Sequence, residues 1–318
     1  MKFMIYLAPI QGFTDYVYRK AYANIFSGVD AFFIPYITAP NDKLLKKYER
    51  EIRPENNLYG RCVPQLLFRD VQELYFLISV VKDHGYSEAN LNLGCPYPMV
   101  TNRGRGAALL ANPNELRSIL DGFFRHFKLK LSVKLRAGLK SPDELKAIIQ
   151  VLNDYPASEI ILHARVAQQL YKGPINDEAF QLAVARSEHP VVYNGDIFSV
   201  EAFESRSDKF ADVSDWMLGR GILMNAFLPA EIKGKRFTEE EKRTILHEFH
   251  DEIVEAYLQT ADNEGNAVNK LRQCWIYFSH HFDDQSRVFK KIKKSKSLND
   301  IKREALLLIR DSALKQSC

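Results

Sequence analysis

Eight short apolar runs, separated by segments with helical periodicity, constrain the fold of this 318-residue chain more than any other sequence feature. The runs are rich in β-branched and aromatic residues and cover residues 3–8, 29–36, 62–68, 87–94, 129–135, 158–164, 190–195 and 213–219. Near-continuous apolar strands that alternate with helices are typical of parallel sheets covered on both faces. Eight such units within about 230 residues predict an α/β fold, a (β/α)8 TIM barrel.

An open doubly wound sheet is the alternative architecture. Such a sheet normally has a glycine-rich GxGxxG turn after its first strand, where it binds a dinucleotide. Here the first run is followed by PIQGFTD (9–15), which lacks that pattern. The sequence therefore favours the barrel.

From about Lys233 onward the strand runs disappear, and the chain has the pattern of helices. We therefore predict a barrel domain over 1–232 and a small all-helical domain over 233–318. The net charge of +4 is too small to indicate nucleic-acid binding, but the second domain separates its charges by sign, with acids concentrated in 239–264. A basic run follows them. It either is a solvated helix face or binds an anionic partner such as RNA. It contains Arg287, Lys290, Lys291, Lys293, Lys294, Lys296, Lys302 and Arg303.

Other sequence features concern the cellular context. No apolar stretch is long enough to cross a bilayer, and the N-terminus lacks the basic lead and the cleavage site of a secretion signal. The cysteines Cys62, Cys95, Cys274 and Cys318 form no CxxC pair and have no histidine at metal-ligand spacing. We therefore expect a cytoplasmic protein with no membrane contact, no disulfide framework and no metal site. We also expect a monomer.

Polar side chains stand where the predicted strands end, which is the edge at which barrel enzymes carry out their chemistry. A buried polar group without a partner costs roughly 1–3 kcal/mol, so a ring of them implies a polar ligand. Singly, Asn194 could be a helix cap and His163 a satisfied core histidine. The strand ends contain Pro9, Gln65, Asn92, Lys134, His163, Asn194 and Arg220.

Two of these strand ends indicate phosphate binding. Asn194-Gly195-Asp196 and Gly219-Arg220-Gly221 follow the seventh and eighth strands, where barrels bind phosphate. Lys134 could hold negative charge on a reduced ring cofactor, while the amides of Gln65 and Asn92 could bond the heteroatoms of a planar heterocycle. Together these residues predict a phosphorylated flavin.

Cys95 lies in NLGCP (92–96), just past the fourth strand. An unperturbed thiol with a pKa of about 8.5 is mostly protonated at neutral pH and can donate a proton. A buried inert cysteine is the alternative, and it is our interpretation for Cys62, Cys274 and Cys318.

The motifs, in this order and spacing, resemble those of the dihydrouridine synthases, flavin-dependent enzymes that reduce specific uridines in RNA, almost always transfer RNA. The resemblance implies FMN in the barrel mouth, NADPH or NADH as the reductant, and a helical C-terminal domain that grips tRNA. It covers nearly the whole chain. It rests on APIQGFTDYVYR (8–19), VPQLL (63–67), NLGCPYPMVTNRGRGAALL (92–110), SVKLRAG (132–138), HARVAQQLYKG (163–173), NGDI (194–197) and LGRG (218–221).

Residue by residue, the resemblance makes Cys95 the general acid. It implies that Asn92 and Tyr171 touch the target base. It also implies flavin contacts from the backbone near Pro9 and from Gln65, Lys134, His163, Asn194, Gly195, Gly219 and Arg220, with Asp196 in the same motif.

The chain departs from its relatives at two places. A lysine is common soon after the Cys-Pro pair in relatives, whereas this chain has Tyr97-Pro98-Met99. The usual aromatic residue beyond the Tyr-x-Gly is replaced around Pro174–Asp177. Both departures lie near the expected substrate, so they leave the identity of the target uridine open.

The hypothesis that follows is hydride transfer from reduced FMN to carbon 6 of uracil, with Cys95 protonating carbon 5 from the opposite face. The uridine must be flipped out of the RNA for this chemistry. We expect RNA contacts from Arg103, Arg105, the segment 43–47 and the lysines of the basic run, although Arg103 and Arg105 could equally form a solvated turn. Two alternatives stay open: a small-molecule flavin oxidoreductase of the dihydroorotate dehydrogenase type, and an RNA-binding or RNA-folding protein.

Overall fold

The computed structural model describes residues 3–315, so Cys318 lies outside the described residues. Eight parallel strands close into a barrel in sequence order, with the last strand paired to the first. This confirms the predicted TIM barrel and excludes the open sheet. The strands are β1 (Met4–Leu7), β2 (Ala31–Ile37), β3 (Arg61–Leu66), β4 (Glu88–Leu93), β5 (Lys130–Gly138), β6 (Ile160–Val166), β7 (Val191–Asn194) and β8 (Asp215–Leu218).

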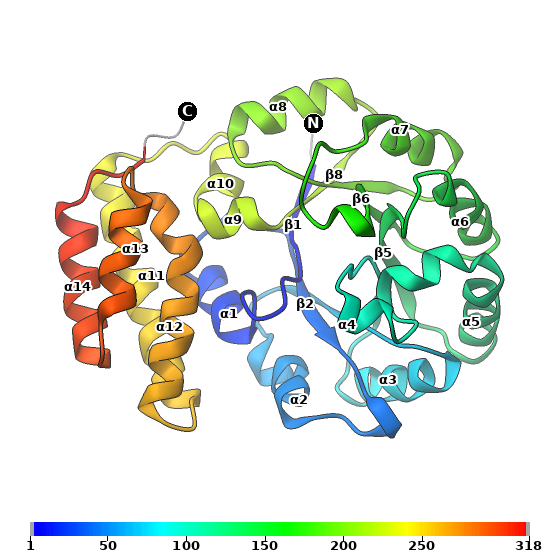
Figure 1. Cartoon of the computed structure of the whole chain (residues 1–318), viewed down its shortest axis with the longest axis horizontal. Coiled ribbons are helices and arrows are strands. Elements are labelled where there is room, and N and C mark those ends of the chain that lie inside the picture. The colour runs from blue at the N-terminus through cyan, green and yellow to red at the C-terminus, as the bar shows by residue number, and fades with distance from the viewer. Residues whose placement is uncertain (1–2, 316–318) are drawn as a thin grey trace. The chain divides into compact units, whose positions relative to one another are not determined.

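Helices after most strands form a ring around the barrel (Figure 1). Their starts follow local capping rules: Asp70 accepts a hydrogen bond from the Glu73 N–H, and Asn112 caps the helix that begins with Pro113. These helices are α2 (Lys46–Ile52), α3 (Val71–Asp83), α5 (Pro113–His126), α6 (Glu144–Asn153) and α7 (Asp177–Arg186). The next helix, α8 (Val200–Lys209), is divided between the two units described below. Short helical segments in the loops are η1 (Pro40–Asp42), η2 (Pro54–Asn56), α4 (Pro98–Thr101), η3 (Gly106–Ala111) and η4 (Ala167–Gln169).

The barrel interior is filled by side chains rather than by solvent. The rings of Tyr6 and Phe33 pack at 5.5 Å between centroids, and both residues are fully buried. Val63, Ile161 and Met217 belong to the same cluster. Since the centre is packed, polar chemistry is confined to the rim at the carboxyl ends of the strands.

By its contacts the chain divides into two compact units, each discontinuous in sequence. The first unit holds all eight strands and comprises Met1–Gln11, Asp30–Gly195 and Ser207–Leu218. The second comprises Gly12–Val29, Asp196–Arg206 and Gly219–Cys318. The division at residue 232 into a barrel and an RNA-binding domain stays a prediction.

The second unit is helical. Its helices are α1 (Tyr16–Ile25), α9 (Arg220–Met224), α10 (Leu228–Ile232), α11 (Glu239–Thr260), α12 (Glu264–Phe278), η5 (Ser279–His281), α13 (Gln285–Lys294) and α14 (Leu298–Asp311), together with the first part of α8. The predicted C-terminal helices are therefore present (Figure 1).

A partly buried carboxylate links α1 to α11 and α12 within this unit. The Tyr257 hydroxyl donates its single hydrogen to the Asp15 carboxylate, which caps α1, and lies 3.0 and 2.9 Å from the two carboxylate oxygens. Lys270 lies 3.3 Å from the same carboxylate. Around them, Trp275, Phe249 and Phe278 form an aromatic core.

Candidate active site

Four polar residues predicted from the sequence lie at the carboxyl rim of the barrel, on four consecutive strands. Gln65 belongs to β3, Asn92 to β4, Lys134 to β5 and His163 to β6. The strand register places Asn92 beside Lys134 and Arg136 beside His163. The structure therefore brings these residues to one edge of the first unit.

A continuous chain of amide hydrogen bonds crosses this rim. The Asn92 Nδ2 donates to Gln65 Oε1 at 2.6 Å, and the Gln65 Nε2 donates to Asn90 Oδ1 at 2.7 Å. Asn90 in turn donates to the Ser132 hydroxyl at 2.8 Å. Asn90 and Ser132 were not predicted from the sequence, although Asn90 precedes Asn92 by two residues and so shares its face of the strand.

Asn92 also fixes the backbone that carries Cys95. Its Oδ1 accepts hydrogen bonds from the N–H groups of Gly94 and Cys95, at 3.1 and 2.9 Å. Cys95 is buried, and this burial raises the pKa of its thiol. The Tyr97 N–H and the cations Arg136 and Lys134 oppose the rise without cancelling it. The thiol is therefore protonated at neutral pH, as a proton donor must be.

The loop after Cys95 is closely packed. Gly106 has a φ of +59°, and a Cβ at this position would lie 2.9 Å from the Cys95 carbonyl oxygen. The Ala107 N–H donates to that same oxygen at 3.1 Å. A side chain at position 106 would therefore push the cysteine out of place.

Arg105, predicted to be an RNA contact or part of a solvated turn, is instead buried in an ion pair. Its guanidinium lies 2.8 Å from the Glu73 carboxylate, and the two side chains are only 10% and 8% exposed. Glu73 also accepts from Thr38 and from the Ala39 and Arg69 N–H groups. A phosphate contact requires an exposed cation, so we now interpret Arg105 as a residue that holds the loop. Arg103, by contrast, is exposed.

Lys134 is a half-buried lysine without a carboxylate partner in the described part of the chain. Within residues 3–315, no carboxylate contributes to the environment of its ammonium group. Desolvation by burial, followed by repulsion from Arg136, lowers the pKa of Lys134 from its ordinary 10.5 to about 7. A half-buried lysine without a carboxylate partner fits an anionic or electron-rich ligand, because such a ligand would favour its protonated form.

We expect Lys134→Met to stabilise the ligand-free protein. Because the folded-state pKa lies below the unfolded value, the unfolded chain binds more protons between pH 7 and 10.5, and stability falls as the pH decreases through this window. The substitution should raise the free energy of unfolding by on the order of 1–3 kcal/mol at pH 7 and less as the pH rises. Urea unfolding at pH 7 and 9.5 measures this, with the exposed Lys146→Met as control. A loss of stability at both pH values would contradict the role of burial.

Arg136 joins the loop of Cys95 to the loop of Tyr171. Its Nε donates to the Gly94 carbonyl at 3.1 Å, and its Nη1 donates to the carbonyls of Val166 and Leu170 at 3.1 and 2.6 Å. The guanidinium also lies 5.3 Å from the centre of the Tyr171 ring. No role was predicted for Arg136 from the sequence, although it lies in the SVKLRAG motif (132–138).

His163 and Tyr171 lie close together at the rim. Their ring centroids are 6.1 Å apart with an angle of 30° between the ring planes, and Tyr171 is 43% exposed. Arg165 Nη1 lies 3.3 Å from the His163 Nε2, and the Arg165 guanidinium also donates to the Gly173 carbonyl. The predicted base contact Tyr171 is therefore presented to solvent on a loop held by two arginines.

Comparison with known proteins identifies the family of this chain. The family described as Dihydrouridine synthase (Dus) matches residues 6–312. The chain belongs to the dihydrouridine synthase family. Membership makes it an enzyme, a flavin-dependent oxidoreductase, and selects this hypothesis over the dihydroorotate-type and non-enzymatic alternatives.

Curated relatives of this dihydrouridine synthase family member align over most of its length. A "Probable tRNA-dihydrouridine synthase" of Helicobacter pylori (strain J99 / ATCC 700824) is 30% identical and covers 80% of this chain and 77% of its own. The "tRNA-dihydrouridine(16) synthase" of Cupriavidus necator is 29% identical over 72% of this chain and 73% of its own. That of Neisseria meningitidis is 25% identical over 95% and 93%.

Among solved structures, the likeness extends to the fold alone. Morphinone reductase is 10% identical, with a TM-score of 0.53, covering 76% of this chain and 88% of its own. An old yellow enzyme homologue from Zymomonas mobilis is 9% identical, with a TM-score of 0.55, covering 74% and 89%. Both support the barrel assignment of this dihydrouridine synthase family member.

The residues predicted for phosphate binding in this dihydrouridine synthase family member have defined local partners. In the first unit, Asn194 donates from Nδ2 to the Met217 carbonyl at 2.7 Å, and a Cβ on Gly195 would lie 2.6 Å from Ile175. In the second unit, Arg220 forms an ion pair with Asp196 at 2.8 Å. Gly219 caps α9, and Pro9, directly after β1, is partly exposed.

The basic run also has a clear local structure in this family member. Arg287 and the four lysines Lys290, Lys291, Lys293 and Lys294 belong to α13, where all five are exposed. Val288 and Ile292 of the same helix are buried. The helix therefore has one apolar stripe and a strongly cationic outer surface.

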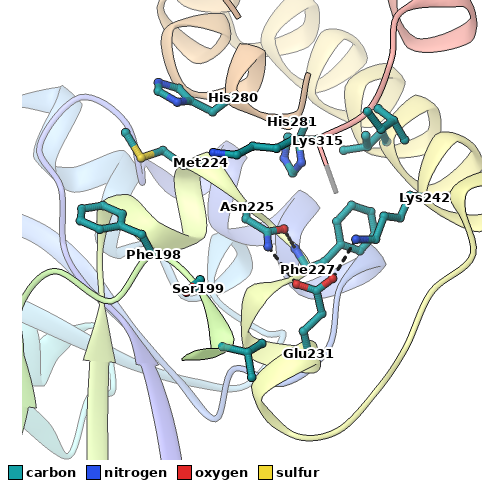
Figure 2. Close-up of a pocket in the computed structure, with 13 residues that line it drawn as sticks. Phe198, Ser199, Met224, Asn225, Phe227, Glu231, Lys242, His280, His281 and Lys315 are labelled. Carbon is teal, nitrogen blue, oxygen red and sulfur yellow. Dashed lines mark hydrogen bonds and ion pairs between the residues drawn. The ribbon is translucent and has the colours of Figure 1, made fainter. Parts of the chain in front are cut away.

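The second unit contains a hollow of about 420 Å³ between α9, α10, α11 and η5 (Figure 2). The polar side chains that line it interact with one another. Glu231 forms an ion pair with Lys242 at 2.8 Å and accepts a hydrogen bond from Asn225 at 2.9 Å. Burial lowers the pKa of His281 to about 3, so that imidazole is neutral.

No cluster of three or more His, Cys, Asp or Glu side chains suited to a metal occurs in the described part of the chain. Likewise, none of the helices over residues 3–315 is both long and apolar enough to span a bilayer.

Proposed function

We propose that this enzyme reduces specific uridines of tRNA to 5,6-dihydrouridine, with FMN as cofactor and NADPH or NADH as reductant. The observation that carries the proposal is the neighbouring pair of a protonated Cys95 thiol and the Lys134 amine, which has no carboxylate partner within residues 3–315, at one rim of the barrel. Relatives that are named tRNA-dihydrouridine synthases align over most of this chain. The proposed location is the cytoplasm and the proposed state a monomer.

The residues at the rim suit FMN. Lys134 supplies a cation where negative charge would develop on the ring, and Gln65, His163 and the backbone near Pro9 supply polar contacts. Asn194, Gly195, Asp196, Gly219 and Arg220 are proposed for the phosphate side, and the ion pair with Asp196 supports a fixed orientation of Arg220. When bound, FMN would supply the hydride for carbon 6 of uracil, and NADPH or NADH would supply the electrons.

Cys95 is proposed as the general acid that protonates carbon 5 of uracil. Its thiol starts protonated because burial raises its pKa, and its backbone is fixed by Asn92. As the S–H bond breaks, the proton goes to carbon 5, and the thiolate left behind has the cations Lys134 and Arg136 nearby. Asn92 and Tyr171 are proposed to contact the base, which must leave its stack to reach them.

The body of the tRNA is proposed to bind the helical domain over 233–318. The exposed cations of α13 support this, and Arg103 on the loop after Cys95 supports a further contact near the flipped base. Lys43, Lys46 and Lys47 are exposed before and within α2 and are proposed as additional phosphate contacts.

The proposal is tested by reconstituting the purified protein with FMN. We expect flavin absorbance that bleaches on adding NADPH and returns when unmodified tRNA is added, together with dihydrouridine in the recovered RNA. Orotate and free uridine serve as competing acceptors. A protein that takes up no FMN, or that reduces orotate but no RNA, would overturn the proposal.

A further inference from the structure

Two large apolar side chains are exposed directly after Cys95. Met99 is 76% exposed and Tyr97 is 48% exposed, and both belong to the start of α4. Because α4 follows β4, it lies at the carboxyl rim, inside the ring of outer helices (Figure 1). Exposed apolar side chains beside a reactive group mark a binding surface more often than isolated ones elsewhere.

The exposure of Met99 is built into the loop. Val100, its neighbour, packs against Cys95 and Leu67. The N–H groups of Val100 and Thr101 both donate to the Tyr97 carbonyl, at 2.8 and 3.0 Å. The buried ion pair of Arg105 with Glu73 holds the far side of the same loop. Inward packing of Val100 therefore fixes Met99 on the outward side.

A uridine that reaches Cys95 leaves a gap in the RNA stack. Proteins that unstack nucleic acids commonly fill such gaps with apolar wedges, including methionine, and stack neighbouring bases on aromatic rings. Met99 and Tyr97 have this chemistry, and a methionine cannot bind the phosphate that a lysine here would bind. The group that contacts Met99 and Tyr97 is thus a nucleobase next to the target uridine.

We propose that Met99 is a wedge that inserts beside the flipped uridine, with Tyr97 as a stacking surface for the neighbouring base. The inference rests on the proposed function, because it requires RNA as the substrate. Met99 is then a positioning residue. It contributes to the rate of uridine reduction only when the target base is stacked in the RNA before binding.

Met99→Ala should therefore lower kcat/KM by about 5- to 100-fold on folded tRNA, the range of losses found when a base loses its stacking partner. It should change kcat/KM less than about 2-fold on a short single-stranded oligonucleotide, whose bases unstack readily. Met99→Leu should retain activity on both substrates. Leu58→Ala is the matched control, because Leu58 is 81% exposed but precedes β3 at the opposite rim.

A second readout follows the unstacking directly. Fluorescence of 2-aminopurine placed next to the target uridine should rise on binding the native enzyme and stay low with Met99→Ala. Equal losses on folded and single-stranded RNA would overturn the wedge and indicate a misplaced Cys95 loop. Unchanged activity on both would also overturn it. If the native enzyme reduces neither RNA, the proposed function fails first, and the wedge fails with it.

Discussion

Replacing Cys95 with alanine should slow uridine reduction by ~10²–10⁴-fold, the usual contribution of a positioned general acid. Reduction of the flavin by NADPH should be nearly unchanged, because the thiol acts only on the uracil. Stopped-flow absorbance measures the two half-reactions separately. We expect the whole loss of rate in the second half-reaction, in which the uridine of the tRNA oxidises the reduced flavin.

Cys95→Ser provides the matched variant for this test. Its hydroxyl is close in size to the thiol but far less acidic, so it should support little of the lost proton transfer. Cys62→Ala, a buried cysteine in β3, should leave both half-reactions unchanged. If Cys95→Ala instead slows both half-reactions equally, the cysteine is structural and another proton donor must be sought.

Replacing the four lysines of α13 with alanine should weaken tRNA binding by up to about 10³-fold near 0.1 M salt. Each phosphate contact contributes roughly 0.7 to 0.9 to the slope of log affinity against log salt, so four contacts contribute about 2.8 to 3.6. The four ammonium groups are exposed, while Val288 and Ile292 keep the helix anchored. Binding isotherms between 50 and 300 mM salt measure both the affinity and the slope. The substituted residues are Lys290, Lys291, Lys293 and Lys294.

An equal loss of charge on the barrel is the control for this experiment. Alanine at Lys82, Lys128, Lys140 and Lys146, all exposed in the first unit, should leave most of the salt slope in place. Oxidation of NADPH with a generic electron acceptor should persist in both quadruple variants. If the α13 variant binds tRNA with unchanged affinity and slope, this surface is only a solvated helix face.

The barrel was predictable because each buried strand needs an apolar run. Short apolar runs that alternate with helical segments are typical of buried parallel strands and of few other structures. Strand ends were harder to place. The fifth run was expected to end at Leu135, yet β5 extends to Gly138 through an irregularity between Arg136 and Gly138. Backbone pairing with β6 continues there after the hydrophobic signal has stopped. The grouping of Gly12–Val29 with the C-terminal helices likewise depends on contacts that have no local signature.

The candidate site was predictable where polar residues interrupt apolar strands, as with Gln65, Asn92 and Lys134. The site was not predictable where it depends on an ion pair between two residues that are far apart in the sequence. Glu73 alone has the pattern of a carboxylate in the first turn of a helix, and Arg105 alone that of a surface arginine. Their pairing across 32 positions needs the barrel to be closed first.

The amide chain at the rim has a single direction, because the backbone N–H groups of Gly94 and Cys95 occupy the Asn92 oxygen. Every later amide must then point its oxygen back toward Asn92 and its nitrogen toward Ser132. The hydrogens left over on Asn92 and Gln65 are donors. This chain of amides therefore favours a docked ring that presents carbonyl oxygens to it, because these accept the donated hydrogens. A ring that presents amino groups there would place its own N–H hydrogens against those of the amides.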